Sequence, residues 1–569
     1  MRIAGPFKFF WLGGPLLLYG WTVTGPLLCD DLQIVLKAES YLGGEREAPD
    51  LFRFAASDEE WRALRDRGTC PWWIAETGRL DFLRPVSEWV MLLDVGLFGR
   101  SATAHRLVSL GVFVVALTCV KWMFRQATGD AVRSGVGTFF FGISQSVAPP
   151  VTWMSNRQDL LVIIGVALAA GAYWGAVRRP YFRWTIPAAA AFAFALLSKE
   201  VAIALAAVLL IHEWHRRRVG KGGAANGPAA AIMVCIVAIA ACYFGYYLWS
   251  RPWLLDFSIK SGTPSQLGER APLAILLYSS VWSLGFPVDI LFSASPAQLW
   301  TVGLVGGALM MLTARYMRKS ARGDEAALFF ILWAILFALP GLRALTTSTR
   351  TLCTATVGWA YLLAGLLVPT DEQRVVVPIF YRHVVFAANG IVSIACVVAT
   401  VLIMNEAERS ARSRLERAVA TMDPPLADGD DLILTNAESN MEIICAGDRL
   451  CYVTGRRGVA ATFLTPPAAD VEFRRSDART LVARSTAGGL LGAPFHRVAR
   501  GNAWRPGKGE TFRHARFEVE VCDVAPDGQV RELRFTFPGG LEQPGLHFEP
   551  PAVVRRGEPT KLTYSGAGP

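Results

Sequence analysis

Apolar residues occur in blocks of about twenty, separated by short polar segments, through the first 404 residues. A block of this length is what an α-helix needs to cross a bilayer core of roughly 30 Å. The pattern predicts a transmembrane domain over residues 1–404 with about 11 transmembrane helices. These cover residues 7–28, 102–124, 133–151, 157–177, 183–198, 200–214, 229–250, 297–316, 325–342, 351–369 and 383–404.

One further apolar stretch, residues 271–293, is interrupted by Pro287 and Asp289. If it crossed fully, the basic segment Arg315–Arg322 would lie outside, against the rule that basic loops stay in the cytoplasm. We therefore expect this stretch to be re-entrant or to lie along the interface, although the sequence leaves open whether it spans. With the N-terminus inside, eleven crossings then put the C-terminus outside.

Polar segments complete the predicted organisation. Residues 29–101 form a long first outer loop, in which Val86–Phe98 is amphipathic and suited to lie flat on a membrane. Residues 405–430 are predicted as a helical linker, because apolar residues recur there at a spacing of four before a turn-rich end.

Residues 431–569 are predicted as a small β-rich domain outside the membrane. Arg516–Asp523 and Arg531–Phe537 alternate in polarity and flank Pro526-Asp527-Gly528, which is typical of a β-hairpin. Leu450–Thr454 is another expected strand. The fold class is therefore a polytopic α-helical membrane protein with a C-terminal β-rich extramembrane domain.

Composition and charge agree with a membrane location. The chain is 52% hydrophobic, and its 18 tryptophans suit helix ends at the membrane interface. The net charge of +10 comes largely from short loops at 121–133, 178–183, 216–221, 315–322 and 374–382, which are then cytoplasmic. The charge thus indicates the lipid bilayer as a partner and no nucleic acid. We expect a bacterial inner membrane protein with a periplasmic C-terminal domain.

Five cysteines fall in segments expected outside the membrane, where an oxidising compartment would permit disulfides. Their pairing stays open, and an odd number leaves at least one thiol free. They are Cys29, Cys70, Cys445, Cys451 and Cys522.

The candidate chemistry begins with Asp30-Asp31, directly after the first predicted helix. Such acids are too costly to be idle inside a bilayer. At the interface the cost falls, so one interpretation is a solvated helix end. The other is a catalytic pair, in which one aspartate takes the proton of an acceptor hydroxyl. The second would orient the acceptor or bind a divalent metal ion that neutralises a leaving phosphate.

Five segments together resemble a known family. "LLCDDLQIV" is similar to the first outer loop of GT-C glycosyltransferases, the fold of protein O-mannosyltransferases. "FLRPVSEWVMLLDVGLFGRSATAHRLVSL" resembles their segment leading into the second helix, and "VTWMSNRQDLLVIIGVALAAGAYW" their "VaW…gRaDlL" segment. "FALLSKEVAIALAAVLLIHEW" resembles their "aLLSKE" hairpin, and "TTSTRTLCTATVGWAYLLAGLL" more weakly their "eRylYlPsagf" helix.

The resemblance covers roughly residues 15–370 and implies a mannosyltransferase-like hexosyltransferase. Its donor would be a sugar on a polyprenyl phosphate. The segment "SQSVAPP" lacks the histidine and glutamate common there, and the tyrosine and proline expected after Arg350 are missing. No tetratricopeptide repeats follow. Donor sugar and acceptor, whether protein, lipid or glycan, therefore stay open.

Cations map to the expected outer face from distant parts of the chain and would bind the donor phosphate, since guanidinium groups suit phosphate. The alternative is ordinary snorkelling at the interface. These residues are Arg84, Arg157, Lys199 and Arg350. Glu88 and Glu200 would pair with them or belong to the acceptor site, and His105 would contact phosphate or serve packing.

The sequence thus predicts an inverting glycosyltransferase with Asp30 or Asp31 as the base. A transporter or flippase is the rival, but it would need polar residues at mid-membrane and repeated helix blocks. The predicted helices are mostly clean, and we find no inverted repeat. A third interpretation is an inactive envelope scaffold in which the β-rich domain is the working part.

Overall fold

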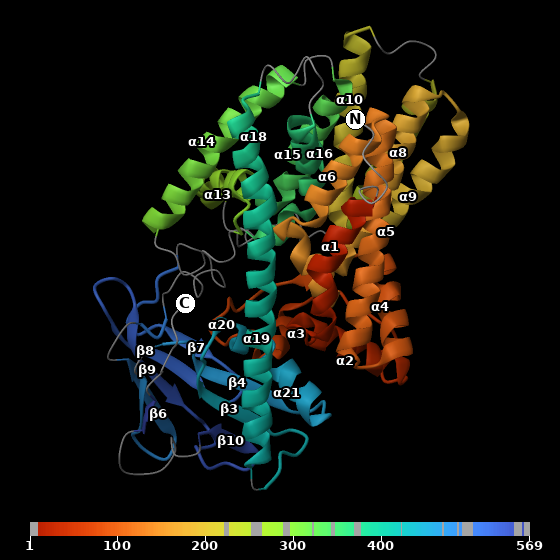
Figure 1. The fold of residues 1–569 in the computed structure, drawn as a ribbon. Coiled ribbons are helices and arrows are strands. Elements are labelled where there is room, and N and C mark those ends of the chain that lie inside the picture. The colour runs from red at the N-terminus through yellow and green to blue at the C-terminus, as the bar shows by residue number, and fades with distance from the viewer. Residues whose placement is uncertain are drawn as a thin grey trace. The chain divides into compact units, whose positions relative to one another are not determined.

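A computed structural model describes residues 9–220, 227–251, 264–287, 296–320, 324–342, 348–368, 377–422, 424–468, 471–485, 489–491, 504–550 and 560–562 (Figure 1). The chain divides into two compact units. The helical unit comprises Met1–Gly25 and Leu83–Leu402, and the mixed unit comprises Pro26–Phe82 and Ile403–Pro569.

The helical unit contains long apolar helices joined by short 3-10 segments. Its helices are α1 (Phe10–Gly20), α4 (Pro85–Phe98), α5 (Ala102–Thr128), α6 (Ala131–Gly142), α7 (Ala148–Thr152), α8 (Gln158–Arg178), α9 (Thr185–Ser198), α10 (Ala204–Arg218), α11 (Gly227–Ser250), α13 (Pro264–Leu284), α14 (Pro296–Ser320), α15 (Glu325–Leu342), α16 (Cys353–Leu367), α18 (Ile379–Phe386) and the first part of α19 (Ser393–Ala420). The 3-10 segments that matter for the site are η4 (Met154–Arg157), η6 (Glu200–Ile203) and η10 (Thr349–Leu352).

Six helical stretches of the described chain are long and apolar enough to cross a membrane, which supports a membrane protein. They are Ala102–Thr128, Met154–Arg178, Gly227–Ser250, Ala297–Met317, Glu325–Leu342 and Ile379–Ala420. Phe182–Ser198 and Pro272–Leu284 are shorter apolar helices, so the count of about 11 stays a prediction. The apolar stretch 271–293 is helical as far as Leu284, and residues 288–293 lie outside the described residues.

The predicted helix 133–151 is divided in the structure. Helix α6 ends at Gly142, and α7 begins at Ala148, with Pro149 in its first turn. Proline has no backbone N–H and is favoured at the first positions of a helix, so Pro149 and Pro150 start a new helix instead of continuing the old one. The division bends the chain shortly before η4, the segment that carries Arg157.

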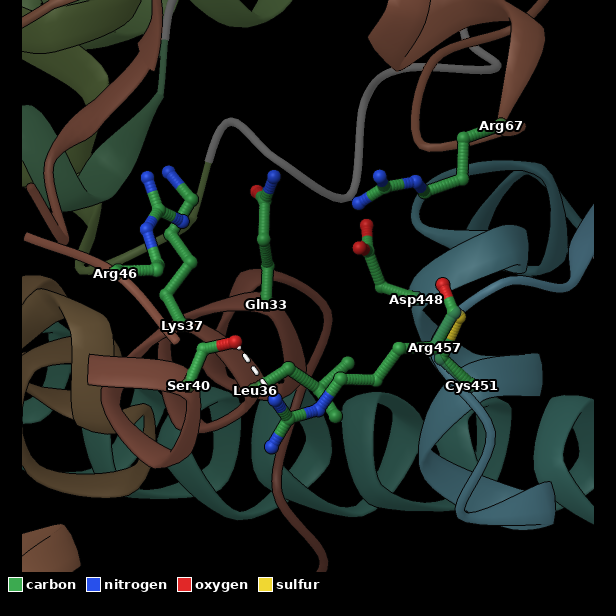
Figure 2. A pocket seen from close by; sticks show the side chains of 9 residues that line it. All are labelled: Gln33, Leu36, Lys37, Ser40, Arg46, Arg67, Asp448, Cys451 and Arg457. Carbon is green, nitrogen blue, oxygen red and sulfur yellow. Dashed lines mark hydrogen bonds between the residues drawn. The ribbon is translucent and has the colours of Figure 1, made fainter. Parts of the chain in front are cut away.

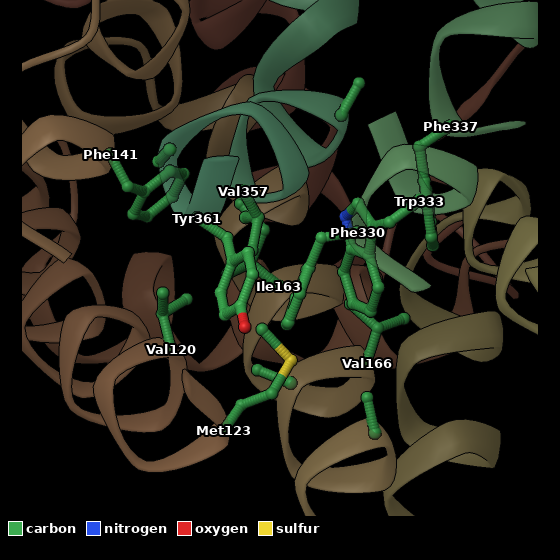
Figure 3. Close-up of a cluster of buried hydrophobic side chains, with 14 of the residues drawn as sticks. Val120, Met123, Phe141, Ile163, Val166, Phe330, Trp333, Phe337, Val357 and Tyr361 are labelled. Carbon is green, nitrogen blue, oxygen red and sulfur yellow. The ribbon is translucent and has the colours of Figure 1, made fainter. Parts of the chain in front are cut away.

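Close packing and aromatic contacts hold the helical unit together. A Cβ on Gly165 of α8 would lie 2.5 Å from the carbonyl oxygen of Ala191 on α9, so only glycine permits this approach. Further along, the rings of Phe330 and Tyr361 stack with centroids 3.9 Å apart, beside the buried Trp333 (Figure 3). The glycine contact joins α8 to α9, and the aromatic contacts join α15 to α16.

The mixed unit begins with α2 (Asp30–Leu42), β1 (Arg53–Ala55), α3 (Asp58–Asp66) and β2 (Leu80–Asp81). Its C-terminal part contains α20 (Asn440–Ile443) and α21 (Ala446–Thr454). The strands are β3 (Asp431–Asn436), β4 (Ala460–Thr465), β5 (Val471–Arg475), β6 (Thr480–Ser485), β7 (Thr511–Arg513), β8 (Glu518–Val524), β9 (Val530–Thr536), β10 (Leu546–Glu549) and β11 (Thr560–Leu562).

Two sheets organise this C-terminal part. One has the order β10-β3-β4 and is parallel, and the other has the order β11-β5-β6-β9-β8-β7 and is antiparallel. The predicted hairpin is present as the pair β8 and β9, with Gly528 at a positive φ of 81° in the turn. The predicted strand at Leu450–Thr454 is wrong, because these residues form the end of α21. Leu450 and Cys451 are buried in this helix, and Tyr452, Val453 and Thr454 are half-buried.

The predicted outer loop 29–101 is split between the two units. Residues up to Phe82 belong to the mixed unit, where Trp72 is buried and its indole N–H donates to the carbonyl oxygens of Phe463 and Leu464, both at 3.1 Å. The predicted boundary near residue 404 agrees with the division between the two units at Leu402, although α19 continues through that point to Ala420. The mixed unit is therefore built from two distant parts of the sequence.

The remaining part of the predicted loop forms α4 in the helical unit. Trp89, Leu93 and Leu97 lie at a spacing of four and are 62%, 63% and 65% exposed. Met91, Leu92 and Val95 are buried on its other side. Apolar residues therefore lie on both sides of α4, and the prediction that Val86–Phe98 lies flat on a membrane stays a prediction.

Candidate functional site

Arg84 is held inside the helical unit by side chains from two other segments. It precedes α4, and its guanidinium forms a forked pair with the Glu200 carboxylate of η6, with N–O distances of 2.9 and 2.6 Å. A third N–H donates to Gln158 Oε1 at 3.0 Å. A bidentate pair of this kind fixes both position and orientation. The pairing of Glu200 with a cation, one of its two predicted roles, is thus observed.

Lys199 precedes Glu200 in the sequence and binds Asp159, the residue of α8 that follows Gln158. Its Nζ donates to both carboxylate oxygens of Asp159, at 2.7 and 2.8 Å. Ser87 of α4 also donates to the carbonyl oxygen of Ser198 at 2.9 Å. The start of α4, the start of α8 and the turn between α9 and η6 are therefore joined into one network of alternating charges.

Arg157 forms a second buried cluster beside the first. Its side chain is fully buried and ion-paired with Asp94 of α4. It also donates to Ser109 Oγ and to the carbonyl oxygen of His105 on α5, both at 2.9 Å. A buried arginine needs such partners, because an unpaired charge inside a membrane protein is expensive.

His105 is buried by the same cluster. Its Nε2 lies 2.8 Å from the carbonyl oxygen of Gly99, and its Nδ1 lies 3.8 Å from Asp94. This is the packing role that the sequence allowed. Glu88 is half-buried in the first turn of α4.

Arg350 differs from the other three cations because its side chain is exposed. It is the second residue of η10, and its guanidinium lies over the ring of Trp153 with 5.2 Å to the ring centroid. Trp153 directly precedes η4, which ends at Arg157. Residues 153–159 thus connect the exposed arginine to the two buried clusters.

The structure brings together Arg84, Arg157, Lys199 and Glu200, while the location of the cations on the outer face stays a prediction. Asp94, Gln158 and Asp159 complete the clusters but were not identified as partners from the sequence. Asp159 lies inside the quoted "NRQDLL" segment, so an acid beside a basic residue at the start of an apolar helix was the available signal.

The predicted acid pair belongs to the mixed unit and begins α2. Asp31 is buried, and its carboxylate accepts the backbone N–H of Leu28 at 3.0 Å. Asp30 is half-buried. Both acids lie in the first turn of the helix, where the positive end of the helix dipole favours a carboxylate.

The turn before the acid pair is strained and firmly held. Cys29 has a positive φ of 41°, which is uncommon for a residue other than glycine. Its backbone N–H donates to Glu408 of α19 at 3.4 Å. Glu408 in turn forms a forked pair with Arg449 of α21, at 2.8 and 2.9 Å, and both side chains are fully buried. Strain of this kind persists only where the surroundings fix it, as at many functional sites.

A metal ion at the acid pair and disulfides among the outer cysteines are two further predictions. Within the described residues, no cluster of three or more histidine, cysteine or acidic side chains suits a metal ion. A divalent ion held by Asp30 and Asp31 with a donor phosphate therefore stays a prediction. Cys29, Cys70, Cys445, Cys451 and Cys522 are all present as free thiols.

Comparison with known proteins gives likeness in structure alone. No family model and no curated protein matches the sequence. Among solved structures, the chain is similar to ArnT from Cupriavidus metallidurans bound to undecaprenyl phosphate, with a TM-score of 0.42, 15% identity, and coverage of 81% of this chain and 86% of that chain. It is similar to the oligosaccharyltransferase AglB from Archaeoglobus fulgidus, in complex with an inhibitory peptide and a dolichol-phosphate (TM-score 0.36, 12% identity, coverage 80% and 65%).

A further similar structure is the arabinosyltransferase EmbB from Mycobacterium smegmatis, with a TM-score of 0.33, 12% identity, and coverage of 94% of this chain and 61% of that chain. The names include sugar-transferring proteins, the class that the sequence resemblance implies. Because the TM-scores lie below 0.5, these likenesses do not assign a family, and we infer the function from the chain's own residues.

Proposed function

We propose that this protein is a membrane glycosyltransferase that moves a sugar from a polyprenyl-phosphate donor to an acceptor hydroxyl. The observation that carries the proposal is the convergence of three family-like segments. Arg84 of "FLRPVSEW", Asp159 of "NRQDLL" and Lys199-Glu200 of "LLSKE" are distant in sequence and bind one another in a single network. Motif residues that meet in this way belong to one functional arrangement.

The network supports the reaction by positioning. Its cations are neutralised by Glu200 and Asp159, so they fix the ends of the helices and do not supply free positive charge. Arg350 is the exposed cation of the four and is the proposed direct contact for the donor phosphate. Trp153 would hold its guanidinium in place through the cation–π contact.

Asp30 is the proposed general base. Its neighbour Asp31 already accepts a backbone N–H and is buried, so its carboxylate serves the turn. Asp30 is the more accessible of the two and sits on a turn fixed by Glu408 and Arg449. A carboxylate fixed by its surroundings can take the acceptor proton as the sugar leaves the phosphate.

The test is a transfer assay with the full-length protein in lipid nanodiscs. A panel of polyprenyl-phosphate sugars is supplied with lipid and glycan acceptors, and release of the polyprenyl phosphate is measured. We expect at least one donor to be consumed, and Asp30→Asn to lose that activity. Glu59→Gln, an exposed acid of the same unit, is the matched control and retains activity. Equal turnover by wild type and Asp30→Asn would contradict the assignment of the base, and no turnover of any donor would contradict the reaction.

A further inference from the structure

A pocket of about 300 Å³ lies within the mixed unit, and its lining does not include Asp30 or Asp31 (Figure 2). Helix α2 contributes Gln33, Lys37 and Ser40 to its wall. The segments after α2 and α3 contribute Arg46 and Arg67. Ligand sites begin at about this volume, which suits a molecule the size of one sugar with one substituent.

The pocket collects positive charge. Figure 2 shows Arg46 beside Lys37 on one side, Gln33 in the middle, and Arg67 near the Asp448 carboxylate on the other side. Asp448 is the one acid of the lining and is buried, and it accepts the Thr69 hydroxyl at 2.7 Å. Burial raises the pKa of Asp448, while the Thr69 hydroxyl and the charges of Arg67 and Lys37 act in the opposite direction.

The cations of this pocket differ in the protein groups that they already contact. Arg457 donates to Ser40 Oγ at 2.8 Å and is ion-paired with the exposed Glu45. Lys37 donates to the carbonyl oxygen of Arg53 at 2.7 Å and lies 4.8 Å from the ring centroid of Phe54. Arg46 and Arg67 form no ion pair with any residue that the structure describes. The lining thus sets four cations, Lys37, Arg46, Arg67 and Arg457, against the single carboxylate of Asp448.

Burial lowers the pKa of Lys37 to about 8, and repulsion from Arg46 acts in the same direction. Asp448, Asp50 and Glu60 act in the opposite direction without restoring the usual value. The electrostatics therefore agree with the geometry: this is an electropositive pocket that would gain from an anion.

Polar neutral groups accompany the cations. Gln33 is only 4% exposed, and its amide offers both a donor and an acceptor. The hydroxyl of Ser40 and the carboxylate of Asp448 add further hydrogen-bonding capacity. Cations suit an oxyanion, whereas a mixture of donors and acceptors suits sugar hydroxyls. We propose that this pocket binds a phosphorylated sugar, with Arg46 and Arg67 on the phosphate and Gln33 on the sugar.

The proposal is tested by binding alone, so it stands or falls separately from the transferase activity. The full-length protein in detergent is titrated calorimetrically with glucose 1-phosphate, glucose and inorganic phosphate. We expect glucose 1-phosphate to bind more tightly than either of the other two. Arg46→Gln and Arg67→Gln should each weaken its binding by about tenfold or more, the usual loss for a charge-assisted hydrogen bond. Arg456→Gln, an exposed arginine beside Arg457 that does not line the pocket, should leave binding unchanged.

Unchanged affinity in the Arg46→Gln/Arg67→Gln double variant would overturn the proposal, as would equal binding of glucose and glucose 1-phosphate. Inorganic phosphate that binds as tightly as the sugar phosphate would overturn the sugar part. Thermal unfolding checks each variant, and Arg46→Gln decides if Arg67→Gln fails to fold, because Arg46 lies in a surface turn. A parallel titration with the glucose phosphodiester of farnesol shows whether the pocket prefers a lipid-linked sugar phosphate or a free one. Tighter binding than glucose 1-phosphate assigns the pocket to a lipid-linked sugar, and weaker binding assigns it to a free one.

Discussion

Replacing Glu408 by glutamine is the sharpest probe of the mixed unit. The carboxylate of Glu408 forms a forked pair with Arg449 and accepts the backbone N–H of the strained Cys29. Both charged side chains have no exposed surface. The glutamine keeps the size of the side chain but leaves the arginine charge buried without a counter-charge. This change therefore isolates the electrostatic role of the pair from its packing.

The expected cost follows from this geometry. Removing one partner of a buried pair costs about 3–5 kcal/mol, because the other charge remains desolvated. In a unit of this size, each kcal/mol lowers the midpoint of thermal unfolding by about 2–4 °C. We therefore expect Glu408→Gln to unfold roughly 6–20 °C below wild type, measured by the fluorescence of the buried Trp72 and Trp73 in nanodiscs.

The double variant Glu408→Leu/Arg449→Leu provides the comparison. Because neither residue then carries a charge, most of the penalty should disappear, as is common when both members of a buried pair are replaced by apolar residues. Glu416→Gln is the matched control on the same helix, as an acid with an exposed side chain. A shift of less than 2 °C for Glu408→Gln would refute the reasoning, since it would show that the arginine charge is not buried as described.

Four further predictions concern the candidate sites. Asp31→Asn should lower the unfolding midpoint by a few degrees in differential scanning fluorimetry, because the Asp31 carboxylate accepts the Leu28 N–H at the start of α2, whereas the exposed-acid control Glu59→Gln should leave it nearly unchanged. Arg157→Met should strongly reduce the yield of folded protein on size-exclusion chromatography, because Asp94 loses its partner. Arg350→Ala should elute normally, since its side chain is exposed, but it should show a higher KM for the donor. Binding of glucose 1-phosphate should weaken as the pH rises through about 8, because Lys37 then loses its proton and its positive charge. In calorimetry, Lys37→Arg should remove this pH dependence. A wild-type affinity that stays constant from pH 7 to 9 would show that the charge of Lys37 does not contribute to binding.

The membrane-embedded part of the fold was largely predictable, because hydrophobic length is a local property. The stretches around 102–124, 157–177, 229–250 and 325–342 all coincide with long apolar helices. The helix predicted over 133–151 is divided, and the proline pair that restarts it was visible in the sequence. The membership of residues 26–82 in the mixed unit was not predictable in this way. It depends on contacts such as that of Trp72 with Phe463, which are 391 residues apart.

The β-rich region shows the same limit at a shorter range. The hairpin of β8 and β9 was predicted correctly, because its turn and alternation are encoded in adjacent residues. The parallel sheet β10-β3-β4 was not, since β3 pairs with a strand more than a hundred residues later. Leu450–Thr454 is apolar enough for either structure, and packing of α21 against the sheet decides for the helix. Short apolar runs are ambiguous until their tertiary partners are known.

The sequence indicated which cations belong to the candidate site, but it did not indicate most of the acids that pair with them. Charge at the ends of apolar helices correctly indicated that Arg84, Arg157 and Lys199 would gather, yet the sequence assigned their charge to a ligand. In the structure, Arg84 is matched by Glu200, Lys199 by Asp159, and Arg157 by Asp94. Acids were weighed mainly as catalysts or acceptor contacts, so two of these three counter-ions were missed. Pairwise neutralisation is what the cost of charge in a membrane protein demands.

This neutralisation has a consequence for how a donor would be recognised. A sugar phosphodiester carries one negative charge, and three of the four candidate cations already have a carboxylate within the described part of the chain. A donor that displaced Glu200 from Arg84 would leave that carboxylate without its partner, at a cost comparable to the gain from the phosphate. Arg350 can accept a phosphate at no such cost, because its guanidinium is exposed and contacts an aromatic face. Within the proposed function, the buried pairs therefore keep the helix ends in place, and the donor charge falls on Arg350.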